Sequence, residues 1–182
     1  YTAWNTAAQT IQAAVNVAAG GDAILITAGV YVVSSPVTVT NAVTISGVGG
    51  RETVVVDAQE QCSVFWVTNA GTRIEGLTIM RGGGGGEAVY GASSLDLSNC
   101  VITACANSGV YLFEGGTIQN CVISSNRSPD NGGGAWGAGF VMTDSQVVNN
   151  QCQYQGGGVN VESCVFSNCL FEGNVAKTDG GG

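Results

Sequence analysis

Short apolar runs recur along the chain and alternate with small or polar residues. In Val37–Val39 and in Leu95–Leu97, two apolar side chains flank a polar one. Alternation with a period of two is typical of strands that bury one face. The runs are separated by Gly, Asn and Ser, which favour tight turns. The pattern predicts an all-β fold built from many short strands.

The C-terminal part of the chain repeats itself every 24 residues, and Asn126, Asn150 and Asn174 keep this step. A period in this range marks stacked repeats, in which each unit buries its apolar surface against its neighbours. From Asp22 to Gly182 we count about seven coils. Parallel connections are right-handed as a rule. The sequence therefore predicts a right-handed parallel β-helix, a β-solenoid, over residues 22–182.

Residues 1–21 follow a different pattern, which predicts an N-terminal capping α-helix. Their apolar residues are spaced i, i+3, i+4 and i+7, and so form one stripe on a helix. Thr6 and Gln9 fit a capping box, and two glycines follow as a stop signal. We expect the helix to cover the first coil, whose core and strand edges would otherwise meet water. The stripe consists of Ile11, Ala14, Val15 and Ala18.

The chain has seven cysteines, an odd number, so at least one thiol is free or pairs with another chain. Cys100, Cys121 and Cys169 occupy one repeat position, with Ser145 and Leu77 at sister positions. Ser and Leu at this position favour a column of small buried side chains. A disulfide framework is the alternative.

A second column lies where one strand bends into the next. Asn side chains stacked at a bend can hydrogen-bond along the axis, and both Asn and Asp tolerate left-handed backbone. We therefore expect this column to form turns rather than to bind a ligand. It consists of Asn99, Asn120, Asp144 and Asn168.

Composition narrows the choice of partner. Hydrophobic residues make up 45% of the chain and charged residues 10%, and the formal net charge is -8. This charge argues against nucleic acid, which needs clustered Lys and Arg, and a polyanionic sugar would need a bridging cation. No apolar run approaches the ~18 residues of a membrane span. The chain starts at Tyr1 without a signal peptide, as a processed secreted protein or a trimmed chain does, so we expect an extracellular or cell-surface location.

The stretch from Thr10 to Tyr31 resembles the opening of right-handed parallel β-helix proteins of the pectin-lyase-like superfamily. Ile74–Ile79 and the Asn-Cys-Val-Ile and Gly-Gly-Gly repeats are similar to those of bacterial surface β-helix proteins, including polymorphic outer-membrane proteins. The resemblance implies the same fold over essentially the whole chain. It selects no function, because this superfamily includes lyases, hydrolases, tailspikes, adhesins and structural proteins.

The enzymes of this superfamily imply two catalytic patterns that can be sought in the chain. Polygalacturonase-like hydrolases use aspartates with a histidine, and this sequence has no histidine. Pectate-lyase-like enzymes use an arginine beside aspartates that hold calcium. Arg127–Asp130 is the one similar stretch, and we expect no acidic neighbour for it on adjacent coils. We predict no catalytic residue, no cofactor and no metal; a calcium site of Glu52, Asp57 and Glu60 is the alternative for the metal.

These observations favour a non-enzymatic structural protein. The last coil stops where the repeat calls for another strand, so we expect unpaired strand edges there. A second copy would cover them head to tail, and contacts of this kind that do not close generate filaments. The partner is then the protein itself, through an assembly surface formed by Trp4, Ile11 and Val15 at one end and by Val165, Phe171, Val175, Gly180, Gly181 and Gly182 at the other.

Two alternatives stay open. The first is a carbohydrate-binding or polysaccharide-degrading β-helix, with glycans as partners and exposed aromatic rings as stacking platforms. Shielding of turns is the competing role for these rings. The second is a fragment of a longer adhesin or autotransporter passenger. The candidate stacking residues are Tyr90, Tyr111, Trp136 and Tyr154, of which the first three stand near the start of successive coils.

Overall fold

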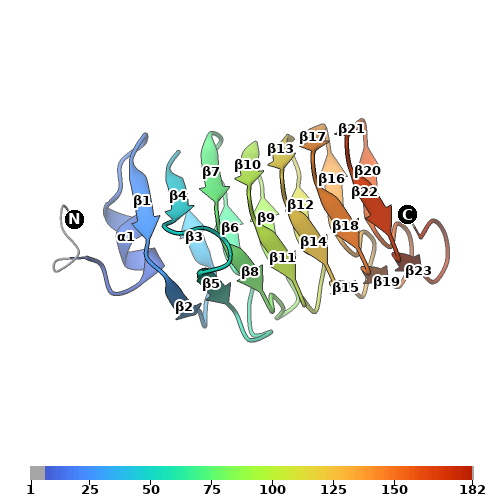
Figure 1. Cartoon of the computed structure of the whole chain (residues 1–182), viewed down its shortest axis with the longest axis horizontal. Coiled ribbons are helices and arrows are strands. Elements are labelled where there is room, and N and C mark those ends of the chain that lie inside the picture. Colours follow the sequence, from blue (N-terminus) through green and yellow to red (C-terminus); the bar gives the residue numbers. More distant parts are fainter. Residues whose placement is uncertain (1–6, 182) are drawn as a thin grey trace.

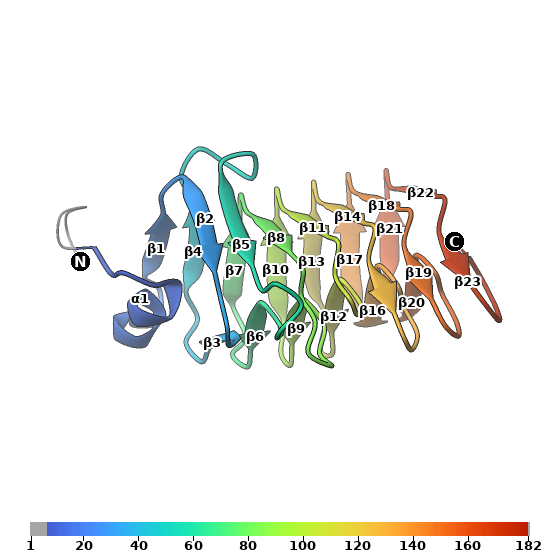
Figure 2. The same cartoon turned by 90° about the horizontal axis from the view of Figure 1, so that it is seen from below.

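The strands wind around one long axis, and each complete turn contributes one strand to each of three sheets (Figures 1 and 2). The structure is a computed structural model that describes residues 7–181. Strands of successive turns pair in parallel, as in the pairing of β10 with both β7 and β13. The predicted parallel β-solenoid is thus confirmed.

The three main sheets are named A, B and C in the order in which the chain enters them. Sheet A contains β1 (Ala23–Ile26), β4 (Thr44–Gly47), β7 (Thr72–Glu75), β10 (Leu95–Ser98), β13 (Gly116–Gln119), β17 (Phe140–Thr143) and β21 (Val165–Ser167). Sheet B contains β2 (Gly29–Val32), β5 (Val54–Asp57), β8 (Thr78–Met80), β11 (Val101–Thr103), β14 (Val122–Ser124), β18 (Gln146–Val148) and β22 (Leu170–Glu172). Sheet C contains β3 (Val37–Val39), β6 (Phe65–Val67), β9 (Val89–Gly91), β12 (Val110–Leu112), β16 (Ala135–Ala138) and β20 (Val159–Glu162). A small sheet D is formed by β15 (Arg127–Ser128), β19 (Gln151–Cys152) and β23 (Val175–Ala176).

The described part of the chain completes about six turns, slightly fewer than the seven coils expected. Sheets A and B have seven strands each and sheet C has six, so the seventh turn is partial. The number of coils expected from the sequence is higher because it includes this partial turn as a full coil.

The core is a set of apolar columns that run along the axis. Leu97 lies in register between Ile74 and Ile118, and all three side chains are 0% exposed. The residues that alternate with them, such as Asp96 and Ser98, reach the surface in part. Burial of these columns is the main favourable contribution to folding, and the alternation in the sequence predicted it.

The last four bends between sheets A and B each have left-handed backbone at one non-glycine residue. The φ angle is 51° at Asn99, Asn120 and Asp144 and 52° at Asn168. Their side chains bond along the axis: Asn120 donates to Oδ1 of Asn99 at 2.5 Å, and Asn168 to Oδ1 of Asp144 at 2.6 Å. The expected turn-forming column is confirmed.

A second column of asparagines lies near sheet D, with Asn126 and Asn150 buried and Asn174 half-buried. Nδ2 of Asn126 donates to Oδ1 of Asn150 at 3.0 Å, and Nδ2 of Asn150 donates to Oδ1 of Asn174 at 3.1 Å. The same Oδ1 atoms accept bonds from the backbone N–H groups of Asn126 and Asn150. Each amide thus satisfies a buried backbone group of the preceding turn, as buried polar groups require.

All seven cysteines lie in the described part of the chain, and none forms a disulfide. Cys100 and Cys121 are buried in the core, and the backbone N–H of Cys121 donates to Oγ of Ser145 at 3.0 Å. This contact places Ser145 in the predicted column. Burial raises the pKa of the Cys105 thiol to about 12, so the buried thiol is unreactive at neutral pH.

One short helix, α1 (Ile11–Val17), packs on the N-terminal end of the solenoid, and the described residues contain no helix long and apolar enough to cross a membrane. Ile11 and Val15 are buried against the first turn, as predicted. The helix starts later than expected because Thr10, not Thr6, is its N-cap: Oγ1 of Thr10 accepts the N–H of Ala13 at 3.1 Å. Thr6 lies outside the described residues.

Candidate functional site

The outer face of sheet C carries a column of four aromatic side chains. Trp66, Tyr90, Tyr111 and Trp136 occupy the same register position on β6, β9, β12 and β16. The column forms because the second residue of each of these strands points outward while the first residue, such as Val89 or Val110, is buried. Parallel stacking then places rings that are distant in the sequence next to one another.

The rings form two stacked pairs joined by a tilted contact. The ring centroids of Trp66 and Tyr90 are 4.1 Å apart, and those of Tyr111 and Trp136 are 4.7 Å apart, with interplanar angles of 26° and 25°. Between the pairs, the Tyr90 and Tyr111 centroids are 5.4 Å apart. In register with Trp136 on the following strand stands Asn160, which ends the column and leaves one face of the Trp136 ring without an aromatic neighbour among residues 7–181.

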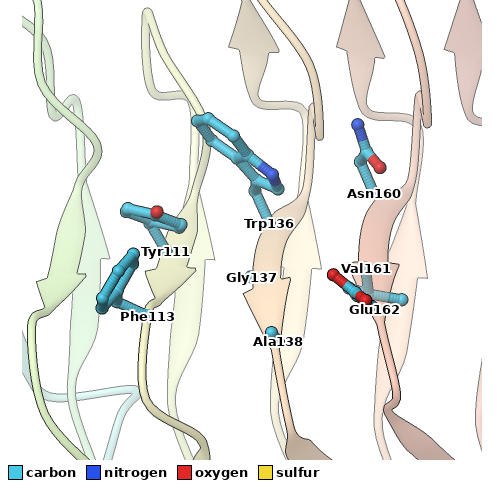
Figure 3. Close-up of a pocket in the computed structure, with 8 residues that line it drawn as sticks. All are labelled: Tyr111, Phe113, Trp136, Gly137, Ala138, Asn160, Val161 and Glu162. Carbon is cyan, nitrogen blue, oxygen red and sulfur yellow. The ribbon is translucent and has the colours of Figure 1, made fainter.

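Beside Trp136 the surface is hollowed (Figure 3). The hollow has a volume of about 240 Å³. Figure 3 shows Phe113 and Glu162 on opposite sides of Ala138, whose small side chain leaves the space between them open. The complete lining is Tyr111, Phe113, Trp136, Gly137, Ala138, Asn160, Val161 and Glu162.

The small residues of β16 explain why the surface is recessed at the hollow. Gly137 has φ +144°, and a Cβ there would collide with the carbonyl oxygen of Leu112. Glycine is the residue that adopts this backbone and permits this close approach. Phe113 is 58% exposed and meets the edge of Tyr111, with ring centroids 6.2 Å apart. The hollow therefore has aromatic groups on one side and the polar groups of Asn160 and Glu162 on the other.

The only charge on the strands of sheet C is acidic. Its six strands contain no Lys or Arg, and Glu162 is their one acidic residue. Desolvation by burial raises the pKa of Glu87, which precedes β9, and the charge of Asp130 raises it further. Desolvation also raises the pKa of Tyr111, with smaller contributions from Tyr90 and Glu87. Glu87 thus lies close to the aromatic column.

The charge of Asp130 reaches one acidic residue outside the adjacent turns. It raises the pKa of Glu87, and the expectation that the Arg127–Asp130 stretch has no acidic neighbour on adjacent coils stays a prediction. The two residues come from turns that are not adjacent, and the loops before β9 and β16 differ in length. Equivalent positions counted along the repeat therefore did not reveal the pair.

Three of the four aromatic residues singled out in the sequence meet in the column, namely Tyr90, Tyr111 and Trp136. Tyr154 does not join them: it lies in the loop before β20, its side chain is 50% exposed, and its backbone N–H donates to the carbonyl of Asp130. Trp66 and Phe113 belong to the aromatic surface but were not predicted. The signal for Trp66 was the run Phe65–Val67, in which an outward residue stands between two buried ones.

The residues proposed for assembly fall into three groups. Trp4 and Gly182 lie outside the described residues. Ile11 and Val15 are 5% and 3% exposed, so they contact the first turn of their own chain. Val165 and Val175 are exposed at 58% and 52%, Phe171 is half-buried, and no backbone or side-chain atom would meet a Cβ added at Gly180. A role of these residues in assembly stays a prediction.

The carboxylate of Asp57 is engaged by an arginine. Nε of Arg81 donates to its Oδ1 at 2.9 Å, and Nη2 of Arg81 bonds its Oδ2. The hydrogen bond from Arg81 lowers the pKa of Asp57. Glu52 lies 3.7 Å from Arg51. Residues 7–181 contain no group of three or more His, Cys, Asp and Glu side chains arranged to hold a metal ion, so the calcium alternative finds no support in this part of the chain.

Comparison with known proteins identifies the class. Residues 20–182 match the family described as right handed beta helix region, and the chain belongs to this family. The family match and the solved structures that share the fold together establish a right-handed parallel β-helix. No curated protein matches the sequence.

Three solved structures share the fold. Pectate lyase Pel9A is 20% identical with a TM-score of 0.72, and the match covers 96% of this chain and 51% of the lyase. A pectin methylesterase solved with a hexasaccharide is 14% identical with a TM-score of 0.63, covering 92% of this chain and 63% of the enzyme. The pectin methylesterase of Aspergillus niger is 12% identical with a TM-score of 0.59, covering 94% and 86%. The chain spans about half the length of the pectate lyase.

Proposed function

We propose that the protein is an extracellular or cell-surface β-helix that binds a saccharide at the hollow on sheet C. The observation that carries this proposal is the Trp136 ring, which stacks on Tyr111 with one face and has no aromatic neighbour in register on the other. Saccharides present apolar C–H faces and polar hydroxyls in one ring. A binding surface of aromatic faces with a few well-placed polar groups matches that combination.

The polar groups of the hollow suit hydroxyl ligands. The Asn160 amide offers both donors and an acceptor, and the Glu162 carboxylate offers acceptors. Both residues lie on β20, one strand away from Trp136 on β16 and two strands away from Phe113, which follows β12. A ring bound between the two strands would contact apolar atoms on one side and hydrogen-bonding groups on the other.

The size of the hollow supports a subsite for one sugar unit of a longer chain. Its volume of about 240 Å³ is below the roughly 300–1,000 Å³ of pockets that enclose a whole drug-sized ligand. The exposed Phe113 at its rim leaves room for a chain to continue along the surface. The pectin methylesterase solved with a hexasaccharide is a protein of this fold that holds an oligosaccharide.

Binding is tested by calorimetric titration of the full chain with hexasaccharides of glucose, N-acetylglucosamine, glucosamine and galacturonic acid. We expect at least one to bind, and Trp136→Ala to weaken that binding by about tenfold or more, a loss near 1.4 kcal/mol. Tyr154→Ala removes an exposed aromatic ring outside the column and is the matched control. Full affinity of the Trp136→Ala protein, or equal losses in both variants, would contradict the proposal.

Cleavage of the bound saccharide is a second candidate, favoured by Glu87 and Asp130. A carboxyl group whose pKa is raised beside a second carboxylate is typical of an acid and base pair in glycoside hydrolysis. Glu87 stands three residues before Tyr90 of the aromatic column in the chain, and its charge contributes to the raised pKa of Tyr111. Mass spectrometry of the incubated hexasaccharides tests it: shorter products that vanish with Glu87→Gln support cleavage, and intact hexasaccharides contradict it.

A further inference from the structure

We propose that the site on sheet C prefers a positively charged saccharide, an oligomer of amino sugars with free ammonium groups, over neutral and acidic sugars. This inference rests on the proposed function and names its ligand class. Two features of the site carry it: the distribution of charge around the hollow, and the geometry of the Trp136 ring and the Glu162 carboxylate.

The face that surrounds the hollow carries acidic side chains and is free of cations on its strands. Glu162 lines the hollow itself, and Glu114 directly follows Phe113 in the chain. Glu87 directly precedes the residues that lead into β9, and its charge acts on the pKa of Tyr111 while the charge of Asp130 acts on the pKa of Glu87. The strands of sheet C contribute no Lys or Arg to balance these carboxylates.

The five cations of the chain are placed elsewhere. Arg73 lies 3.6 Å from Asp96 on sheet A, and Arg81 pairs with Asp57 at the end of sheet B. Nζ of Lys177 donates to Gln153 at 2.6 Å. The other two are Arg51, beside Glu52 at 3.7 Å, and Arg127, on β15 of the small sheet D.

An ammonium group in the hollow would meet two attractive partners at once. The face of an indole ring carries the negative part of the ring quadrupole and attracts cations within about 6 Å of its centroid. Trp136 supplies such a face, and Glu162 supplies a full negative charge from the neighbouring strand. A neutral sugar retains the stacking and the hydrogen bonds but loses this attraction.

An acidic sugar meets the opposite situation. Its carboxylates would face Glu162, and the protein as a whole has a net charge of -8. Bound cations relieve such repulsion in other proteins, but no group of potential metal ligands was found among residues 7–181. Repulsion of this kind acts over about 8 Å at physiological ionic strength, a range that includes neighbouring strands.

The test compares hexaglucosamine with its fully N-acetylated form, which has the same rings and linkages without the charge. We expect the wild-type protein to bind hexaglucosamine about tenfold more tightly, and this ratio to fall as salt is raised from about 50 to about 500 mM. Glu162→Gln should remove most of the preference, because it lowers the affinity for hexaglucosamine much more than the affinity for the N-acetylated hexamer, to which the glutamine oxygen still offers a hydrogen-bond acceptor. Glu172→Gln, which neutralises an exposed acid on sheet B, should leave both affinities unchanged.

The outcomes separate this inference from the proposed function. Binding of the neutral hexamer with equal or weaker binding of hexaglucosamine overturns the charge preference but leaves saccharide binding intact. A preference that survives Glu162→Gln overturns the assignment to the hollow. Absence of binding to every hexasaccharide in the panel overturns the proposed function and this inference together.

Discussion

Trp136 stacks on Tyr111 across two turns of the solenoid, with ring centroids 4.7 Å apart and planes tilted by 25°. The register of β12 and β16 dictates this contact, because it places the two residues directly opposite one another. The stacking holds the indole in a fixed orientation and leaves its other face toward the hollow. Stability of the column and binding at the hollow therefore depend on the same ring.

The aromatic column should contribute measurably to stability. Tyr111→Ala removes the contacts with Tyr90, Trp136 and Phe113, and we expect it to lower the free energy of unfolding by about 2–3 kcal/mol, since an aromatic pair contributes roughly 0.5–1.5 kcal/mol beyond burial. Tyr154→Ala is the matched control at an exposed site and should cost below about 1 kcal/mol. Urea unfolding followed by circular dichroism measures both. Equal losses would contradict a stabilising role for the column.

Packing of the core should be sensitive to loss of volume. Leu97 is 0% exposed between Ile74 and Ile118, and we expect Leu97→Ala to cost about 3 kcal/mol through lost burial and the cavity it leaves. Gln119→Ala on the neighbouring strand removes an exposed side chain and should change stability by less than about 0.5 kcal/mol. The same urea titration compares them, and a loss near 1 kcal/mol or less at Leu97 would mean that the core collapses around the missing atoms.

At the left-handed bends, the predicted loss of stability depends on which residue replaces the asparagine. Asn120 has φ 51° and donates a hydrogen bond to Asn99. Ala there loses the bond and adopts a conformation that costs roughly 1–2 kcal/mol, whereas Gly adopts it freely. We expect Asn120→Ala to destabilise the protein more than Asn120→Gly, by about 1 kcal/mol in thermal or urea unfolding. The reverse order would contradict the account of these bends.

The ion pair of Asp57 and Arg81 should make stability depend on pH in the acid range. Arg81 lowers the pKa of the folded Asp57 below its ordinary value of 3.8. The pair therefore stabilises the protein fully above that value, and this contribution disappears as the pH falls through the lower pKa of the folded state. Asp57→Asn should be less stable than wild type near neutral pH, and the difference should narrow below about pH 4.

Arg81→Gln provides the companion measurement for this pair. This variant removes the same interaction by changing the arginine. The difference between its free energy of unfolding and that of the wild type should therefore narrow over the same pH range. Unfolding measured in urea at several pH values gives both curves. A difference that stays constant down to the acid limit of folding would show that Asp57 acts through packing rather than charge.

Much of the fold was predictable because the sequence repeat aligns equivalent positions of successive turns. The column of Asn99, Asn120, Asp144 and Asn168 stands at one position of successive units, and each of these residues has the expected left-handed backbone. The cysteine column was predictable for the same reason: Ser145 at a sister position indicated a small buried side chain. One alignment of the repeat thus predicts the inward set and the bends, and it favours a column of small buried side chains at the cysteine position.

The site was harder to predict because it depends on loops of unequal length. Trp66 lies in an early turn outside the regular repeat, and Phe113 follows the end of β12 where no repeat column points to it. Tyr154 keeps the repeat step of Asp130 and not that of Trp136, so it falls in a loop instead of the aromatic column. Glu87 and Asp130 come from loops that a count along the repeat does not align. The proximity of such residues cannot be predicted from the repeat alone.

The most direct test of the central claim uses the three tryptophans as separate reporters. Each indole N–H gives its own nuclear magnetic resonance signal, and the spectra of Trp66→Phe and Trp136→Phe assign those of Trp66 and Trp136. On titration with the hexasaccharide that binds, our account predicts that the Trp136 signal shifts in a saturable manner while that of Trp66, two strands beyond Tyr111, stays in place. Saturable binding that leaves the Trp136 signal unmoved would show that the saccharide binds elsewhere, and the site on sheet C would have to be abandoned.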